Sequence, residues 1–222
     1  MRRLIAVVCC HAYAYPKHDE TRGGHTSGEN KNRSSAIRET WYSDWLKYKD
    51  QIDLKFFYGR GANRCPDVDE VFLDCPDDYY SLPRKVQKIF EWTLANGYDQ
   101  VLKVDDDVFV YVSRLVSAFG NDDYRGYEVE AASGRYASGT AYWASKRSME
   151  NVVKAELCPE DWAEDKFVGK TLAAAGISLI HDERYHCCHC PDCEKAAPQI
   201  GRITSHTSRP EEMKRLWQTI SL

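Results

Sequence analysis

Residues 101–110 read Val-Leu-Lys-Val-Asp-Asp-Asp-Val-Phe-Val, with three consecutive acids between two apolar runs. Short apolar runs of this kind predict a buried β-strand that passes through the acids. Alternate side chains of a strand point to opposite faces, so Asp105 and Asp107 share one side and Asp106 takes the other. Crowded carboxylates at the end of a buried strand repel one another, and a hard divalent cation relieves this repulsion. A solvated acidic turn is the alternative for an isolated triplet, and the flanking strand pattern favours the metal site.

Apolar runs and amphipathic stripes alternate along the chain. This alternation predicts an α/β fold, with a largely parallel sheet and helices on its faces. We expect strands at 4–9, 54–58, 71–73, 101–110, 141–144 and 177–180, and helices from about 35, from 83 to 97, around 115, from 145 to 153, from 165 to 176 and after 208. Ile37, Trp41 and Trp45 recur at four-residue intervals, which favours one helix with these side chains in the core. No repeat, low-complexity tract or linker divides the 222 residues, so we expect a single domain over 1–222.

Charge and composition exclude several function classes. The net charge of −4 argues against general binding of nucleic acid or anionic membranes. The apolar stretch at 4–10 is too short to cross a membrane and lacks a cleavage signal, so the expected localisation of the sequence as written is cytoplasmic. No GxGxxG or P-loop pattern is present, which disfavours a dinucleotide oxidoreductase and a P-loop enzyme.

The acid triplet has a position that suits a nucleotide. Ligands of open α/β sheets bind beyond the carboxyl ends of the strands, and the acids follow directly on Val104. A divalent cation held there would neutralise both the acids and a bound diphosphate. Without a glycine loop to cradle phosphate, the metal would have to hold the phosphate itself.

Six blocks of sequence, spread in order over about residues 35–180, carry a more specific signal. They are Ser35–Trp41, Phe56–Gly59, Asp77–Lys85, Leu102–Val110, Tyr136–Tyr142 and Glu164–Gly169. In all six the chain resembles the β-1,3-galactosyltransferase and Fringe-like group, glycosyltransferase family 31. The resemblance implies a GT-A fold, the Rossmann-like mixed sheet flanked by helices of the nucleotide-diphospho-sugar transferases. Ser81 departs from this pattern, because the family has asparagine there.

The resemblance also implies an activity. It is the inverting transfer of a hexose or N-acetylhexosamine from a UDP-sugar to an acceptor hydroxyl, with a β-1,3 linkage, assisted by Mn²⁺ or Mg²⁺. The acceptor would be a glycan, glycolipid or glycoprotein. Typical members are Golgi enzymes with a membrane anchor and a stem, so the Golgi lumen is expected only if this sequence is a fragment of an anchored enzyme.

Carried over by position, the family's site residues fall on acids already singled out. Asp107 and Asp105 would ligate the metal, and His206 is a further candidate ligand, with a surface histidine as the alternative. Asp165 would be the base that deprotonates the acceptor, because a base must stand within reach of the hydroxyl. A helix N-cap is the alternative for Asp165. The candidate contacts to the donor nucleotide are Asp105, Asp106, Arg38, Lys85 and Gly139.

Residues 186–193, His-Cys-Cys-His-Cys-Pro-Asp-Cys, form a second distinctive segment. Cys190 and Cys193 have the spacing of a zinc hairpin, and Cys187, Cys188 and His189 could complete a tetrahedral site. Strong zinc signatures use two separated ligand pairs, which this segment lacks, so free thiols or a disulfide are equally compatible with the sequence. Bound Zn²⁺ would have a structural role, pinning this loop beside the acceptor site.

Two other function classes fit the sequence less well. One is a non-catalytic module that binds carbohydrate or protein on a degenerate GT-A fold, and such a module needs no separate base like Asp165. The other is a zinc-knuckle nucleic-acid binder, which needs a basic stripe near 186–193. Glu183, Asp192 and Glu194 surround that segment instead.

Overall fold

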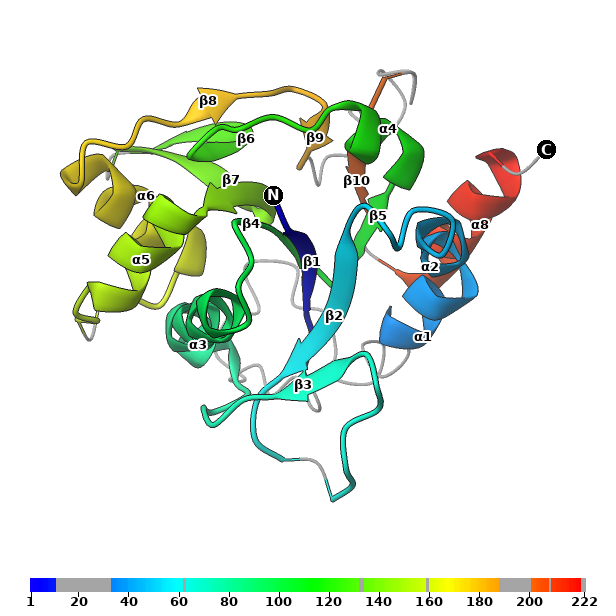
Figure 1. Cartoon of the computed structure of the whole chain (residues 1–222), viewed down its shortest axis with the longest axis horizontal. Coiled ribbons are helices and arrows are strands. Elements are labelled where there is room, and N and C mark those ends of the chain that lie inside the picture. The colour runs from blue at the N-terminus through cyan, green and yellow to red at the C-terminus, as the bar shows by residue number, and fades with distance from the viewer. Residues whose placement is uncertain are drawn as a thin grey trace.

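The computed structural model describes residues 1–10, 33–61, 63–131, 134–158, 160–187, 201–207 and 209–220. Within this part of the chain two sheets form the centre of the molecule (Figure 1). The larger sheet contains, in spatial order, β3 (Glu70–Phe72), β2 (Asp53–Tyr58), β1 (Arg3–Val8), β4 (Gln100–Asp105), β7 (Gly134–Ser145), β6 (Tyr124–Ala131) and β8 (Ile180–His181). The smaller sheet contains β5 (Val108–Val110), β10 (Thr204–His206) and β9 (Tyr185–His186), in that order.

The larger sheet is parallel in one half and mixed in the other. Strands β3, β2, β1 and β4 run parallel, whereas β7 is antiparallel to both β4 and β6. Val8 of β1 pairs with Asp105 of β4, so the carboxyl ends of these two strands meet at one edge of the sheet. The predicted fold class, a mixed α/β sheet flanked by helices, is therefore confirmed.

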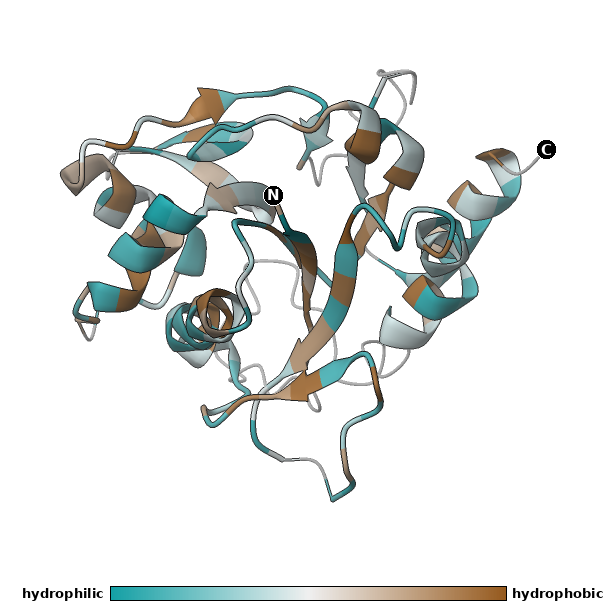
Figure 2. Ribbon diagram, viewed as in Figure 1, coloured by the Kyte–Doolittle hydropathy of each residue, from teal (hydrophilic) through white to brown (hydrophobic). Residues whose placement is uncertain are grey.

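Helices cover both faces of the larger sheet (Figure 1). One core contains residues of α1 (Arg33–Glu39), α2 (Trp41–Trp45), α4 (Val112–Ser117) and α8 (Pro210–Ile220), and the other contains residues of α3 (Leu82–Ala95), α5 (Lys146–Lys154) and α6 (Glu164–Ala174). Ile5 and Val7 of β1 pack into the first core, while Leu4 and Ala6 pack into the second. A strand that feeds two cores must be apolar on both faces, and β1 is coloured hydrophobic in Figure 2.

The predicted helix through Ile37, Trp41 and Trp45 is divided into α1 and α2. Thr40 causes the break, because its backbone leaves the helical region and its hydroxyl donates to the carbonyl of Ala36 at 2.6 Å. The core positions of the three apolar side chains are confirmed. The Trp41 indole also donates to the Val108 carbonyl at 3.1 Å, which fixes these helices to the smaller sheet.

The single strand predicted through the acid triplet is wrong. Strand β4 ends at Asp105, Asp106 and Asp107 form a turn, and β5 continues in the other sheet. The apolar runs on either side were correctly identified as buried strands, but periodicity does not reveal that they belong to different sheets.

Other boundaries also differ from the predictions. Strand β6 was missed, because its half-exposed sequence carries charges and Gly126 instead of a clean alternation. The strand predicted at 177–180 is wrong for most of its length, since β8 begins at Ile180 and the Ile177 amide still donates to Leu172 at the end of α6. The helices predicted from 83 to 97 and from 145 to 153 are confirmed as α3 and α5, and the Ser145 side chain caps α5 by accepting from the Ser148 amide. The helix predicted after 208 is confirmed as α8, and Ser208 itself lies outside the described residues. None of the described helices has the length and apolar character needed to cross a membrane.

The close approach of α6 to β7 yields a first prediction. A Cβ added at Gly169 would lie 2.3 Å from the Cβ of Tyr136, so the helix or the strand would have to move. We expect Gly169→Ala to lower the free energy of unfolding by about 1–3 kcal/mol, measured by urea denaturation. The control is Ala174→Ser on the same helix, an exposed change expected to stay within about 0.5 kcal/mol. An unchanged midpoint for Gly169→Ala would contradict this packing.

Candidate active site

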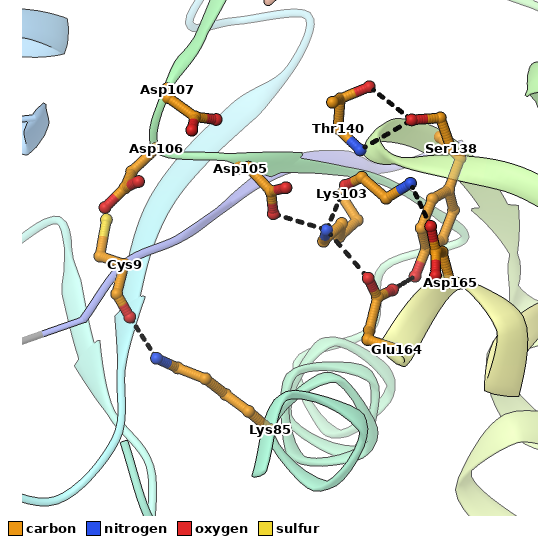
Figure 3. Close-up of polar contacts among 12 residues, drawn as sticks. Cys9, Lys85, Lys103, Asp105, Asp106, Asp107, Ser138, Thr140, Glu164 and Asp165 are labelled. Atoms are coloured by element: carbon orange, nitrogen blue, oxygen red, sulfur yellow. Dashed lines mark hydrogen bonds and ion pairs between the residues drawn. The ribbon is translucent and has the colours of Figure 1, made fainter. Parts of the chain in front are cut away.

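The three acids gather at the carboxyl edge of the parallel half of the sheet. Asp105 is the last residue of β4, and its side chain remains 36% exposed. Asp107 follows in the turn, with its side chain 15% exposed. Figure 3 shows the carboxylate of Asp106 directed toward Cys9 and that of Asp105 directed toward Lys103. The alternation predicted for the triplet is not followed, because Asp106 and Asp107 lie in a turn and one Arg33 nitrogen lies within 3.1 Å of both carboxylates.

His206 lies beside Asp107 because β10 pairs with β5. The pairing is antiparallel and places His206 opposite Val108, one residue after Asp107. The Thr207 amide then donates to the Asp107 carbonyl at 2.7 Å, which joins the end of β10 to the turn before β5. As a result His206 Nε2 lies 3.4 Å from Asp107 Oδ2. Burial opposes the charged imidazole, but the Asp107 carboxylate beside it raises the pKa of His206 above its usual value.

Arg33 is a residue of this cluster that the sequence did not single out. Its guanidinium lies 3.1 Å from Asp106 Oδ1 and 2.9 Å from Asp107 Oδ2, and its side chain is buried. Burial raises the pKa of the Asp106 carboxyl to about 7, although Arg33 lowers it. No sequence signal distinguishes Arg33 from an ordinary surface arginine, because its partners are more than seventy residues away.

A second buried cation, Lys103, lies on the other side of Asp105. Its ammonium donates to Asp105 Oδ1 at 2.6 Å, to Glu164 Oε2 at 3.1 Å and to the Gly139 carbonyl (Figure 3). The Tyr142 hydroxyl donates to the other oxygen of Glu164. Burial opposes the charge of Lys103, but the two carboxylates raise its pKa above the usual value. A period-two reading of β4 could have paired Lys103 with Asp105, since both point to the same face.

Asp165 lies in the first turn of α6 and is not its N-cap. The helix begins at Glu164, and Ala163 occupies the cap position. One Asp165 oxygen accepts from the Gly139 amide at 3.2 Å and the other from the Lys166 amide at 2.9 Å. Each oxygen retains a lone pair for another donor, and the residue is half-buried. Gly139, predicted to contact the donor, thus connects Asp165 with Lys103.

The two basic candidates, Arg38 and Lys85, lie in ion pairs within the protein. Lys85 is buried and not solvated, and its ammonium donates to the Cys9 carbonyl and to Asp77. Arg38 stacks 4.2 Å from the Phe56 ring and pairs with Asp69. These contacts give both residues a role in joining secondary-structure elements, and their contact with a nucleotide stays a prediction.

The aromatic pair Tyr142–Trp143 has no exposed face for a sugar. Both side chains are buried, Tyr142 in the core with α3, α5 and α6 and Trp143 in the opposite core. The two side chains alternate across β7, which would allow one to face a sugar, but both are used in packing. Strand β7 is covered by packed residues on both sides at this point, which leaves no room for a ligand.

Metal ligands are only partly assembled. Among the described residues, no three His, Cys, Asp or Glu side chains are grouped to hold a metal ion, and the candidate donors come as the Asp107–His206 pair. Of the zinc candidates Cys187 is described. Cys188, His189, Cys190 and Cys193 lie outside the described residues, so the zinc site stays a prediction.

Comparisons with known proteins agree with the sequence blocks. Residues 32–132 match the family model described as Galactosyltransferase. The chain is 25% identical over 175 residues to UDP-GalNAc:beta-1,3-N-acetylgalactosaminyltransferase 2 of Mus musculus, covering 68% of this chain and 33% of that protein. It is 24% identical to Beta-1,3-galactosyltransferase 1 of Homo sapiens in an alignment 237 residues long, which covers 88% of this chain and 72% of that protein. The chain spans about a third of the length of the first of these relatives.

Two solved structures are similar in shape at low identity. One is a glycosyltransferase involved in the glycosylation of the major capsid of PBCV-1, with a TM-score of 0.49 and 16% identity over 96% of this chain and 98% of that chain. The other is a putative nucleotide-diphospho-sugar transferase from Desulfovibrio desulfuricans G20, with a TM-score of 0.47 and 16% identity over 82% of this chain and 80% of that chain.

The burial of Glu164 yields a second prediction. Burial raises its pKa from 4.5 to about 7, although Lys103 lowers it. Folding therefore raises the proton affinity of Glu164, and the resulting contribution to stability is complete below pH 4.5 and lost as the pH rises through 7. We expect Glu164→Gln to reduce the fall in melting temperature between pH 5 and pH 8, measured by circular dichroism. Asp44→Asn, at a surface pair, is the control, and parallel curves for Glu164→Gln and wild type would contradict the assignment.

Proposed function

We propose that this chain, which matches the Galactosyltransferase family model over residues 32–132, is an inverting glycosyltransferase. It would move a hexose or N-acetylhexosamine from a UDP-sugar to a hydroxyl of a glycan, glycolipid or glycoprotein and form a β-1,3 linkage. The names of the two relatives described above support a β-1,3 product and a galactosyl or N-acetylgalactosaminyl donor.

One observation carries the proposal: the acids form two groups with different surroundings. Asp107 lies 2.9 Å from the Arg33 guanidinium and 3.4 Å from His206 Nε2, so this carboxylate has both a cationic partner and a potential co-ligand beside it. Asp165 accepts hydrogen bonds from two backbone amides, and among the described residues it forms no ion pair with a cationic side chain. Acceptor activation needs such a carboxylate, oriented by its neighbours and able to take a proton. A module that only binds carbohydrate has no use for this second group.

The donor set suits Mn²⁺ or Mg²⁺. Both metals are commonly bound in proteins by one or two side chains together with substrate phosphates, so a two-residue site is sufficient. Asp107 and His206 would hold the cation, with Asp105 next to them, and Arg33 would adjust its contact with Asp107. When bound, the cation would neutralise the negative charge that develops on the departing diphosphate.

The chain's own residues perform the remaining steps. Asp105, partly exposed beside the cation site, is placed to accept a hydrogen bond from a ribose or sugar hydroxyl. Asp165 accepts the proton of the acceptor hydroxyl through either oxygen, while the Gly139 and Lys166 amides keep the carboxylate oriented. Inversion then follows from attack on the sugar carbon from the face opposite the diphosphate.

A UDP-release assay tests the proposal. Wild type, Asp107→Ala and Asp165→Asn are incubated with UDP-galactose, UDP-N-acetylgalactosamine, UDP-N-acetylglucosamine or UDP-glucose, with Mn²⁺ or with EDTA. We expect turnover with one donor, lost with EDTA and in Asp107→Ala. Asp165→Asn should bind UDP normally but turn over about 10²–10⁴-fold more slowly, because only the base is lost.

The matched control is Asp44→Asn, the same chemical change at a surface ion pair, which should leave turnover unchanged. No UDP binding by wild type with any metal would overturn the proposal and favour the binding module. Turnover of Asp165→Asn at the wild-type rate would exclude Asp165 as the base.

His206 allows a test that needs no turnover. We expect His206→Ala to weaken Mn²⁺ binding in the presence of UDP by about 10-fold or more, measured by isothermal titration calorimetry. His181→Ala, at a histidine of β8 that accepts from the Glu128 amide, is the control. Equal Mn²⁺ affinity in wild type and His206→Ala would remove His206 from the proposed ligand set.

A further inference from the structure

Lys103 is buried in β4, two residues before the end of the strand, where no substrate could reach its ammonium. An ammonium has three hydrogens, and this one has three acceptors. They belong to three elements: Asp105 of β4, the Gly139 carbonyl of β7 and Glu164 of α6. All of its donors are thus used within the protein.

The Gly139 contact extends the network to the proposed base. Gly139 offers its carbonyl to Lys103 and its amide to Asp165. A Cβ at this position would lie 3.2 Å from Glu164 and 3.4 Å from Asp165, so a larger residue would press against both acids. Glu164, the residue before Asp165, is held by Lys103 directly. The base is therefore connected to Lys103 by two routes, one through the strand and one through its own helix.

We propose that Lys103 is a positioning residue that fixes the acceptor base Asp165 relative to the donor-side acid Asp105. This inference rests on the proposed function and goes beyond it by naming what joins its two halves. Asp105 and Asp165 lie on different elements, and the Lys103 ammonium bonds directly to the first and through Gly139 and Glu164 to the second. Figure 3 shows Lys103 between the two acids.

The alternative is that Lys103 only neutralises buried acids. A double variant separates the two roles. Lys103→Met removes the ammonium and keeps the length of the side chain, but leaves Glu164 without its cation. Lys103→Met/Glu164→Gln also removes the buried Glu164 carboxyl, so the unpaired acid that remains is Asp105, which is 36% exposed, while the connection to Asp165 stays broken.

The experiment compares wild type, Lys103→Met, Glu164→Gln and the double variant in melting temperature, UDP affinity, kcat and KM. We expect the double variant to recover most of the melting temperature lost in Lys103→Met. Its kcat should remain on the order of 10²-fold below that of Glu164→Gln, with UDP affinity retained, because a small misplacement of a reacting group costs about this much. A double variant with the kcat of Glu164→Gln would overturn the proposal.

A second readout does not depend on turnover. Hydrogen exchange of the Gly139 amide reports directly on its bond to Asp165. In Lys103→Met we expect the protection factor of this amide to fall about 10-fold or more below that of wild type. Gln87→Met is the matched control, since Gln87 is equally buried and bonds the Val152 and Ala155 carbonyls away from the site. Unchanged protection of Gly139 in Lys103→Met would overturn the proposal even if wild type showed no transferase activity. An inactive wild type with lost Gly139 protection would overturn the proposed function alone.

Discussion

Carboxylates can be buried at the end of β4 only because two cations are buried with them. Arg33 bridges Asp106 and Asp107, and Lys103 joins Asp105 to Glu164. Taking such charges out of water is costly, and unpaired acids would either stay protonated or open the structure. The two cations allow the apolar β4 to carry a dense group of acids directly at the edge of the core. The arrangement of α1, β7 and α6 around this edge follows, because each must supply a partner to it.

The topology brings distant residues to this edge. Parallel pairing aligns the ends of β1 and β4, and antiparallel pairing of β5 with β10 returns the last part of the chain to Asp107. The Thr207 amide and hydroxyl both donate to the Asp107 carbonyl, so the contact is made by backbone as well as by His206. On the other side, β7 and α6 approach through Gly139 and Gly169, where side chains are absent.

The sequence predicted features that depend on local pattern. The apolar runs that form β1, β2 and β4, the helix after Pro83, and the acids at a strand end all follow from periodicity and turn chemistry. The turn at Asp106 and Asp107 could not be predicted in this way, because an apolar run has the same composition whichever sheet it joins. The partners of Arg33 were not predictable either, since they depend on pairings between segments far apart in the chain. Asp165 looked like a cap, and only the start of α6 at Glu164 shows that it is not.

The turn after Asp105 has a consequence for how the site comes apart. Asp105, Lys103 and Asp165 are anchored in the larger sheet and the helix against it, whereas Asp107 and His206 border a sheet of three short strands. Short strands with few neighbours open at a lower free energy than a long central sheet. Partial unfolding would therefore separate the cation-binding half from the base while the base stayed ordered. The site therefore depends on both sheets, and opening of the smaller sheet alone would be enough to remove its cation-binding half.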